Sequence, residues 1–177
     1  MTTVLFICIE NSCRSQMAEA IFNQLAPRGT GAISAGSKPA SEVNLLALAV
    51  LREIGIETSG LRPKLLTRNM AQQADKIVTM GCPEACPAVG KPMEDWGIED
   101  PSSADVEAYR TAREIIRSKV ERLVEALHRN QTRNAPGEGS TKRREGNHSV
   151  SIRRTTPQAR VSRSECSMLR AGASGSG

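Results

Sequence analysis

Residues 4–25 read VLFICIENSCRSQMAEAIFNQL, and this stretch decides the fold class. Its first six residues, VLFICI, are apolar and mostly β-branched or aromatic, which is typical of a strand buried on both faces. Polar residues 10–12 interrupt the run. Residues 14–25 then carry apolar side chains three and four positions apart, the spacing of an amphipathic helix, at Met17, Ala18, Ile21, Phe22 and Leu25. The stretch therefore predicts a strand, a tight loop and a helix.

The same alternation continues along the chain. Apolar runs at residues 31–35 and 76–80 predict two further strands, and helical spacing at residues 43–54 and 106–127 predicts two further helices. Strands that alternate with helices form an open parallel sheet with helices on both faces. In such α/β sheets the ligand lies beyond the carboxyl ends of the strands. Cys8 and Cys82 both come at that end of a predicted strand.

Charge and hydrophobicity divide the 177-residue chain near residue 130. Residues 1–130 hold all four aromatic side chains and carry 15 Lys and Arg against 16 Asp and Glu, a net charge of −1. Residues 131–177 carry 9 against 3, a net charge of +6, and only four of Ile, Leu, Val or Phe, too few to build a core. We therefore expect a folded domain at 1–130 and a disordered basic tail at 131–177. The tail is interpreted as a solvated appendage, and an arm that binds nucleic acid or another anionic surface is the alternative.

No stretch approaches the roughly 18 apolar residues that a membrane-spanning helix needs. Residues 1–15 also lack the basic start and the long apolar run of a signal peptide. We therefore expect a protein of the reducing cytoplasm with no membrane partner. In that compartment cysteines are interpreted as catalytic or metal-binding thiols before structural disulfides. The chain has five: Cys8, Cys13, Cys82, Cys86 and Cys166.

The loop between the first strand and the first helix carries a Cys-x5-Arg-Ser motif, formed by Cys8, Arg14 and Ser15. A loop wrapped at this place points successive backbone N–H groups inward and forms an anion-binding nest at the positive end of the helix. Arg14 would offer two planar donors to a tetrahedral oxyanion, and the same field would favour Cys8 as a thiolate nucleophile. The predicted oxyanion-binding residues are Cys8, Ile9, Glu10, Asn11, Ser12, Cys13, Arg14 and Ser15.

Three residues of this loop have further expected roles. Asn11 is expected to stabilise the unusual loop backbone, and Ser15 to donate a hydrogen bond to the Cys8 thiolate. Cys13 is expected to be a packed structural thiol beside the loop.

Cys82 and Cys86 form a second motif, Cys-x3-Cys. Two residues four apart on a helical turn face the same side at roughly 6 Å, within the Cα separation that a disulfide tolerates. A redox pair is therefore favoured. A structural zinc site is the alternative, but zinc prefers four ligands, and the two histidines, His128 and His148, lie at the end of the last predicted helix and in the tail. No metal is expected.

A third feature is the dipeptide Asp100-Pro101. A carboxylic acid near the nest could protonate an oxygen that leaves the bound oxyanion. Taken alone, an Asp-Pro step is more often a turn.

Several stretches together resemble one known family. Residues 8–22, CIENSCRSQMAEAIF, resemble the phosphate-binding loop of the low-molecular-weight protein tyrosine phosphatase superfamily. Four further stretches are similar to the thioredoxin-coupled arsenate reductases on that fold: SAGSKPA (34–40), VLREIGIETSG (50–60), VTMGC (78–82) and EDWGIEDP (94–101). The resemblance covers about residues 2–128 and leaves the tail unmatched.

The resemblance implies a reaction and a role for each site residue. Cys8 would attack arsenate, Asp100 would be the acid, Cys82 the attacking thiol and Cys86 the resolving thiol. Arsenite would be released, thioredoxin or a similar dithiol protein would recycle the enzyme, and no cofactor would be needed. Ser102 and Ser103 follow Asp100 in place of the tyrosine pair that lines the cleft of the eukaryotic phosphatases, which favours a small inorganic oxyanion.

Two alternatives remain open from the sequence. The first is a low-molecular-weight phosphatase that acts through a phosphocysteine at Cys8, which leaves Cys82 and Cys86 without a role. The second is a non-catalytic thiol protein that binds zinc or trivalent arsenic, which leaves the Cys-x5-Arg-Ser motif and Asp100 unexplained.

Overall fold

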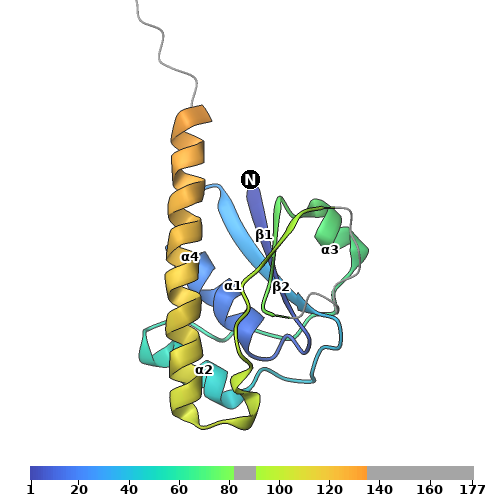
Figure 1. Ribbon diagram of the computed structural model, residues 1–177, viewed down its shortest axis with the longest axis vertical. Helices are drawn as coiled ribbons and strands as arrows, with labels where there is room; N and C mark the ends of the chain where they lie inside the picture. Colours follow the sequence, from blue (N-terminus) through green and yellow to red (C-terminus); the bar gives the residue numbers. More distant parts are fainter. Residues whose placement is uncertain (82–90, 135–177) are drawn as a thin grey trace, which may run out of the picture. The chain divides into compact units, whose positions relative to one another are not determined.

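The computed structural model describes residues 1–81 and 91–134 of the chain. A sheet of four parallel strands lies at its centre, in the order β2-β1-β3-β4 (Figure 1). The strands are β1 (Thr2–Cys8), β2 (Thr30–Gly36), β3 (Lys76–Thr79) and β4 (Met93–Asp95). In the register of the sheet, Cys8 lies opposite Gly36 and Ile7 opposite Thr79, so the carboxyl ends of β1, β2 and β3 meet at one edge. The predicted open parallel sheet is confirmed.

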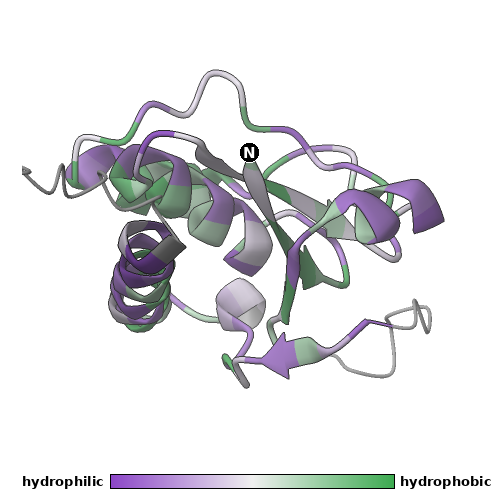
Figure 2. Cartoon of the chain, turned by 90° about the horizontal axis from the view of Figure 1, so that it is seen from above, coloured by the Kyte–Doolittle hydropathy of each residue, from purple (hydrophilic) through white to green (hydrophobic). Residues whose placement is uncertain are grey.

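Helices cover both faces of this sheet, as the sequence also predicts. They are α1 (Arg14–Leu25), α2 (Leu45–Glu53), α3 (Arg68–Gln73) and α4 (Val106–Asn134), and one 3-10 turn, η2 (Pro101–Ser103), precedes α4. The helices α1, α2 and α4 pack together on one face of the sheet, and α3 covers the other (Figure 2). Because strand side chains alternate between faces, Val4 and Phe6 belong to the first layer, whereas Leu5 and Ile7 belong to the second.

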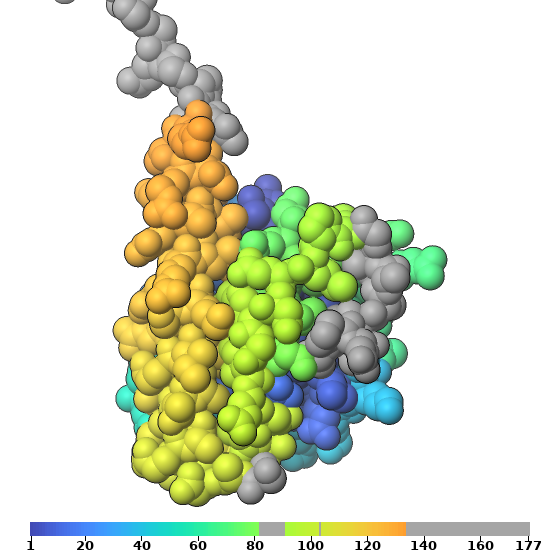
Figure 3. All heavy atoms as spheres, in the orientation of Figure 1, coloured from blue at the N-terminus to red at the C-terminus, as the bar shows by residue number. Residues whose placement is uncertain are grey.

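Aromatic rings fill the layer between the sheet and the helices α1, α2 and α4. Phe6 packs against Phe22 of α1 and against Trp96, with 5.9 and 5.4 Å between the ring centroids. Tyr109 of α4 is fully buried in the same cluster. The segment between β4 and α4, drawn in yellow-green, covers the face of the molecule beside α4 (Figure 3). Within this segment, Trp96 and Ile98 are buried in the same core cluster as Tyr109.

The structure differs from the sequence prediction in a few elements. The sequence does not predict α3 or β4, because α3 buries only Ala71 and the residues of β4 are all exposed, so neither has a clear apolar repeat. The helix α2 begins at Leu45, two residues later than predicted, because the Asn44 side chain accepts a hydrogen bond from the Leu46 N–H and caps the helix.

The last helix is longer than the sequence predicts. It continues to Asn134, past the boundary expected at residue 130. The remainder of the predicted tail, residues 135–177, lies outside the described residues. Among the helices of residues 1–81 and 91–134, none has the length and apolar character needed to cross a membrane.

Candidate active site

The loop of residues 9–13 connects the end of β1 to the start of α1. Three of its carbonyls point to a neighbouring segment, because those of Ile9, Glu10 and Ser12 accept bonds of 2.9 Å from the backbone N–H groups of Lys38, Ala40 and Asn44. Asn11 has a φ of 49°, a left-handed conformation that asparagine tolerates better than most residues. With those carbonyls held outward, the loop has the geometry of an anion-binding nest.

Cys8 lies at the floor of this loop and is almost fully buried. Its Sγ accepts a hydrogen bond from the Asn11 backbone N–H at 3.2 Å and lies 2.9 Å from Ser15 Oγ. The Asn11 side-chain Nδ2 donates to Ser15 Oγ at 2.7 Å, so the Ser15 hydroxyl hydrogen is available for the sulfur. The predicted contact of Ser15 with Cys8 is present, and the Asn11 backbone N–H is a second donor to the same sulfur.

Arg14, the first residue of α1, joins the loop to two distant parts of the chain. One terminal nitrogen donates to the carbonyls of Met80 and Ile98 at 2.9 Å each, and the other pairs with Asp100 Oδ2 at 2.5 Å. The Arg14 side chain is only 8% exposed. Its guanidinium is therefore held in one orientation by these three partners, with one terminal nitrogen directed to Asp100.

Asp100 stands at the rim of the site, with a side chain that is 48% exposed. Its other oxygen, Oδ1, accepts from the Ser102 backbone N–H at 3.1 Å and caps η2. The structure thus brings Cys8, Arg14 and Asp100 together, although 86 residues separate Arg14 from Asp100. Asp100 therefore begins the turn that an Asp-Pro step predicts, and it also lies beside Arg14, where the acid was expected.

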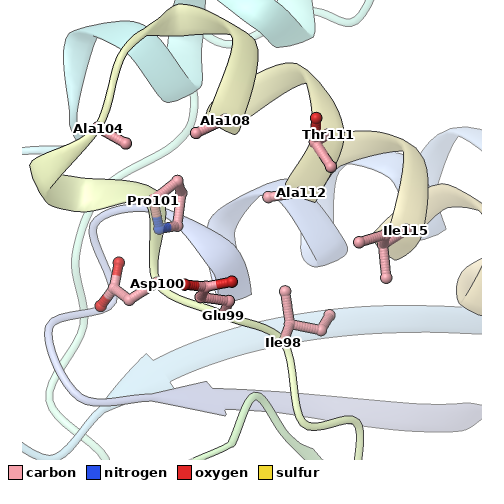
Figure 4. A pocket seen from close by; sticks show the side chains of 9 residues that line it. All are labelled: Ile98, Glu99, Asp100, Pro101, Ala104, Ala108, Thr111, Ala112 and Ile115. Carbon is pink, nitrogen blue, oxygen red and sulfur yellow. The ribbon is translucent and has the colours of Figure 1, made fainter.

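A cavity of about 330 Å³ adjoins Asp100 on the side of α4 (Figure 4). Its two walls come from the segment before η2 and from the first turns of α4, and its lining residues are Ile98, Glu99, Asp100, Pro101, Ala104, Ala108, Thr111, Ala112 and Ile115. The lining is mostly apolar, and Asp100 belongs both to this wall and to the Arg14 ion pair.

The other loop residues divide into exposed and buried ones. Ile9 is 41% exposed and Glu10 is exposed, so their side chains line the mouth and only their backbone can serve the nest. Glu10 Oε2 accepts a hydrogen bond from Ser12 Oγ at 3.2 Å.

Cys13 is buried beneath the loop. Burial, together with the nearby charges of Asp100 and Cys8, raises the pKa of the Cys13 thiol to about 12. Cys13 therefore stays a neutral thiol at physiological pH, which agrees with the packed structural thiol that the sequence predicts.

Two residues that hold the loop were missed by sequence reasoning. Gln16 is fully buried, and its Nε2 donates to Asn11 O, to Asn11 Oδ1 and to the Arg62 carbonyl at 2.7–3.1 Å. Gly36 ends β2 so close to the loop that an added Cβ would lie 2.4 Å from Ile9 O. The glycine at a strand end was the available signal for Gly36, whereas Gln16 has the polar neighbours Glu19 and Asn23 on its helix face, which did not mark it as buried.

Cys82 and Cys86 lie outside the described residues, so the structure does not place them. The chain that leads to Cys82 is placed as far as Gly81. Asp95 of β4 accepts from Thr79 Oγ1 at 2.6 Å and from the Gly81 N–H at 2.7 Å, and these bonds lower the pKa of Asp95. Asp95, also missed from sequence, thereby anchors the residue immediately before Cys82.

Comparison with proteins of known sequence gives consistent relatives. The chain is 34% identical over 128 residues to the glutaredoxin arsenate reductase of Synechocystis sp., a match that covers 70% of this chain and 97% of that protein. It is 32% identical over 127 residues to an arsenate reductase of Staphylococcus aureus, covering 68% of this chain and 95% of that protein.

Solved structures with the same fold include enzymes of two activities. A thioredoxin-dependent arsenate reductase of Corynebacterium glutamicum superposes with a TM-score of 0.65 at 35% identity, covering 74% of this chain and 64% of that one. An arginine phosphatase from Geobacillus stearothermophilus superposes with a TM-score of 0.71 at 28% identity, covering 78% of this chain and 100% of that one.

The family model for low molecular weight phosphotyrosine protein phosphatase matches residues 3–133, which include the loop, Arg14, Asp100 and nearly all of α4. The chain therefore belongs to the low molecular weight phosphotyrosine protein phosphatase family, and proteins named arsenate reductase are among its relatives in sequence and in structure.

Proposed function

We propose that this chain is an arsenate reductase, which converts arsenate to arsenite through a relay of Cys8, Cys82 and Cys86. The observation that carries the proposal is the bond from Arg14 to the Met80 carbonyl. Because Met80 follows β3 directly, this bond joins the oxyanion loop to the strand that leads, two residues later, to Cys82. A second thiol that must reach the Cys8 adduct is expected in the segment that begins there.

In the first step, arsenate binds the N–H groups of the loop and the Arg14 guanidinium. The Cys8 thiolate attacks arsenic, an As–S bond forms, and one As–O bond breaks. Asp100, held beside Arg14, donates a proton to the departing oxygen, which leaves as water. The nest and the arginine offset the charge that gathers on the remaining oxygens.

In the second step, the Cys82 thiolate attacks the Cys8 sulfur. An S–S bond forms, the As–S bond breaks, and its electron pair stays on arsenic, so that As(V) becomes As(III) and leaves as arsenite. The two thiols supply both electrons. Cys86 then attacks Cys82, frees Cys8 and moves the disulfide to the Cys82–Cys86 pair, which an external dithiol protein reduces.

Thioredoxin, or a similar dithiol protein, is the proposed reductant. The names of the relatives support this class of partner, since one is called a glutaredoxin enzyme and another a thioredoxin-dependent one. A relay of free thiols needs a reducing compartment, and we place the protein in the cytoplasm on that ground.

A phosphatase is the second candidate, because Cys8, Arg14 and Asp100 are also sufficient for a phosphocysteine route, and a phosphatase is among the structural neighbours. The serines after Asp100 offer no ring on which an aryl phosphate could stack. This difference favours arsenate over a phosphotyrosine substrate, with any phosphatase activity as a residual one.

Two cysteine variants test the relay. Cys82→Ser should capture arsenate without releasing arsenite, and hydrolysis of an aryl phosphate at Cys8 should survive. Cys86→Ser should complete a single round and then stop with Cys8 and Cys82 joined, because nothing moves the disulfide to the external reductant. Arsenite release is measured with reduced thioredoxin present, and peptide mapping after one turnover identifies the disulfide.

Cys166→Ser is the matched control, since the proposal gives Cys166 no part in the relay. It should turn over arsenate at the wild-type rate. Repeated arsenate turnover by Cys82→Ser, or a mapped disulfide that contains Cys13 or Cys166, would contradict the proposed relay. Aryl phosphate hydrolysis without any arsenate-dependent use of thioredoxin would favour the phosphatase instead.

A further inference from the structure

A chain of hydrogen bonds leads from the Cys8 sulfur to an ion pair near the surface. Cys8 Sγ contacts Ser15 Oγ, and the Asn11 Nδ2 group donates both to Ser15 Oγ at 2.7 Å and to Ser34 Oγ at 2.8 Å. The Ser34 hydroxyl donates in turn to the Glu19 carboxylate, and Lys64 Nζ pairs with the same carboxylate oxygen at 2.9 Å. The catalytic sulfur and the Lys64 ammonium are thus the two ends of one polar connection.

Asn11 is the centre of this connection, and its side chain has no spare hydrogen-bonding group. Its two amide hydrogens go to Ser15 and Ser34, and its Oδ1 accepts from the Lys64 backbone N–H at 2.7 Å and from Gln16 Nε2 at 3.1 Å. The amide can serve Ser15 as a donor only in this orientation. If it turned over, its oxygen would face Ser15 and would compete with Cys8 for the hydroxyl hydrogen.

The orientation of the Asn11 side chain depends on the negative charge of Glu19, which is mostly buried. Asn11, Ser15 and Ser34 have no exposed surface, and the Glu19 side chain is only 14% exposed. Because an ionised carboxylate only accepts hydrogen bonds, the Ser34 hydroxyl must donate to Glu19. The Ser34 oxygen is then free to accept the hydrogen bond from Asn11. Lys64 is the cation that compensates this carboxylate, and an enclosed charge that loses its partner is strongly unfavourable.

We propose that Lys64 is a positioning residue for the nucleophile. It acts twice on Asn11, through its backbone N–H and through Glu19 and Ser34, and it thereby keeps the Ser15 hydroxyl directed at Cys8. For the reaction itself this inference depends on the proposed function, but Cys8 reactivity can be measured with no arsenate present.

The first test is the rate at which iodoacetamide alkylates Cys8 at pH 7 in the full-length chain. The tryptic peptide of residues 1–14 contains Cys8 and Cys13, and fragment masses separate the two. Lys64→Met should slow alkylation of Cys8 by about tenfold, the factor carried by one hydrogen bond to a charged group. Lys64→Arg, which keeps the cation, should stay within about threefold of the wild type, because a guanidinium also pairs with a carboxylate.

The second test separates charge from packing. Glu19→Gln removes the enclosed charge but keeps an oxygen that accepts from Ser34, so it should restore most of the lost rate when added to Lys64→Met. If Lys64 merely packed against its neighbours, the two substitutions would slow alkylation at least as much as Lys64→Met does alone. Such a result would overturn the proposal.

Ser34→Ala cuts the connection in the middle and gives an independent measurement if Lys64→Met does not fold. Alkylation of Cys8 should slow in Ser34→Ala, because the Glu19 carboxylate then has no hydroxyl through which to act on Asn11. A rate unchanged by Ser34→Ala would refute the connection. Melting curves of each variant show whether it is folded.

Lys76→Met is the matched control. Lys76 also forms a surface ion pair, with Glu94 at 2.6 Å, but it begins β3, far along the sheet from Cys8. Its loss should leave the alkylation rate unchanged. If the alkylation rate of Cys8 depends on Lys64 as expected but the protein does not reduce arsenate, only the proposed function is refuted. If the protein reduces arsenate normally and Lys64→Met leaves the alkylation rate of Cys8 unchanged, only this inference is refuted.

Discussion

Replacement of Gly36 by alanine gives a direct test of how the oxyanion loop is held. Gly36 is the last residue of β2 and lies opposite Cys8 in the sheet. A Cβ at this position would lie 2.4 Å from Ile9 O, 2.8 Å from Asn11 N and 2.9 Å from Asn11 Cβ. Two of the three are backbone atoms of the loop, so no side-chain rotation can relieve those contacts.

The size of the effect follows from these distances. An ordinary contact begins near 3.4 Å, so the loop must move by about 1 Å at Ile9 to accept the methyl group. Overpacking of this kind typically costs about 1–3 kcal/mol, and we take the upper end because backbone atoms are involved. At about 3–5 °C per kcal/mol for a domain of this size, the melting temperature should fall by about 10–15 °C. A displacement of about 1 Å at a reacting group also costs roughly 100-fold in rate.

The assay measures kcat/KM for arsenate with thioredoxin recycling, alongside a melting curve and the alkylation rate of Cys8. Gly31→Ala is the control on the same strand, because its Cβ would meet only the end of the flexible Met1 side chain at 3.1 Å and Asn23 Oδ1 at 4.0 Å. That variant should behave as the wild type. If Gly36→Ala kept kcat/KM and Cys8 alkylation within twofold of the wild type, the reasoning about the loop would be wrong.

Three further predictions concern other parts of the molecule. Arg14→Lys should recover little of the oxyanion binding that Arg14→Ala loses, since an ammonium cannot make the three bonds to Met80, Ile98 and Asp100 in one plane; near-normal arsenate kinetics in the lysine variant would remove Arg14 from the site. Hydrogen bonds from Arg110 and Arg113 lower the pKa of Glu53 from its ordinary 4.5 to about 2, so the carboxylate stabilises the fold above pH 4.5 and this contribution disappears as the pH falls toward 2. The difference in melting temperature between wild type and Glu53→Gln should therefore be full at pH 6 and shrink through that interval, and a constant difference would contradict the assignment. A chain that ends at residue 134 should keep the wild-type melting temperature and arsenate turnover, because residues 135–177 hold only four of Ile, Leu, Val or Phe; a large fall in either quantity would show that the tail belongs to the fold.

Much of the fold was predictable because its pattern is local. The apolar run at the start of the chain and the helical spacing that follows it lie within 22 consecutive residues, and the same repeat marks β2, β3, α2 and α4. Where the repeat is weak, prediction failed. The strand β4 and the helix α3 are held by hydrogen bonds and by a few contacts to the sheet, and these have no signature within six residues of sequence.

For the site, the sequence alone determined the residue types of the loop and their order. A cysteine stands at the strand end, an asparagine follows in the loop, an arginine begins the helix, and a serine comes directly after the arginine. Only the tertiary structure decided how they are oriented. Two of the three partners of Arg14 are backbone carbonyls, 66 and 84 residues away. Asn11 is fixed by the Lys64 backbone N–H 53 residues away, and Gly36 is required because two strands meet beside the loop. Any residue can offer a backbone carbonyl or N–H, so no side-chain pattern marks these contacts. They exist only once the parallel sheet brings the ends of its strands together at one edge.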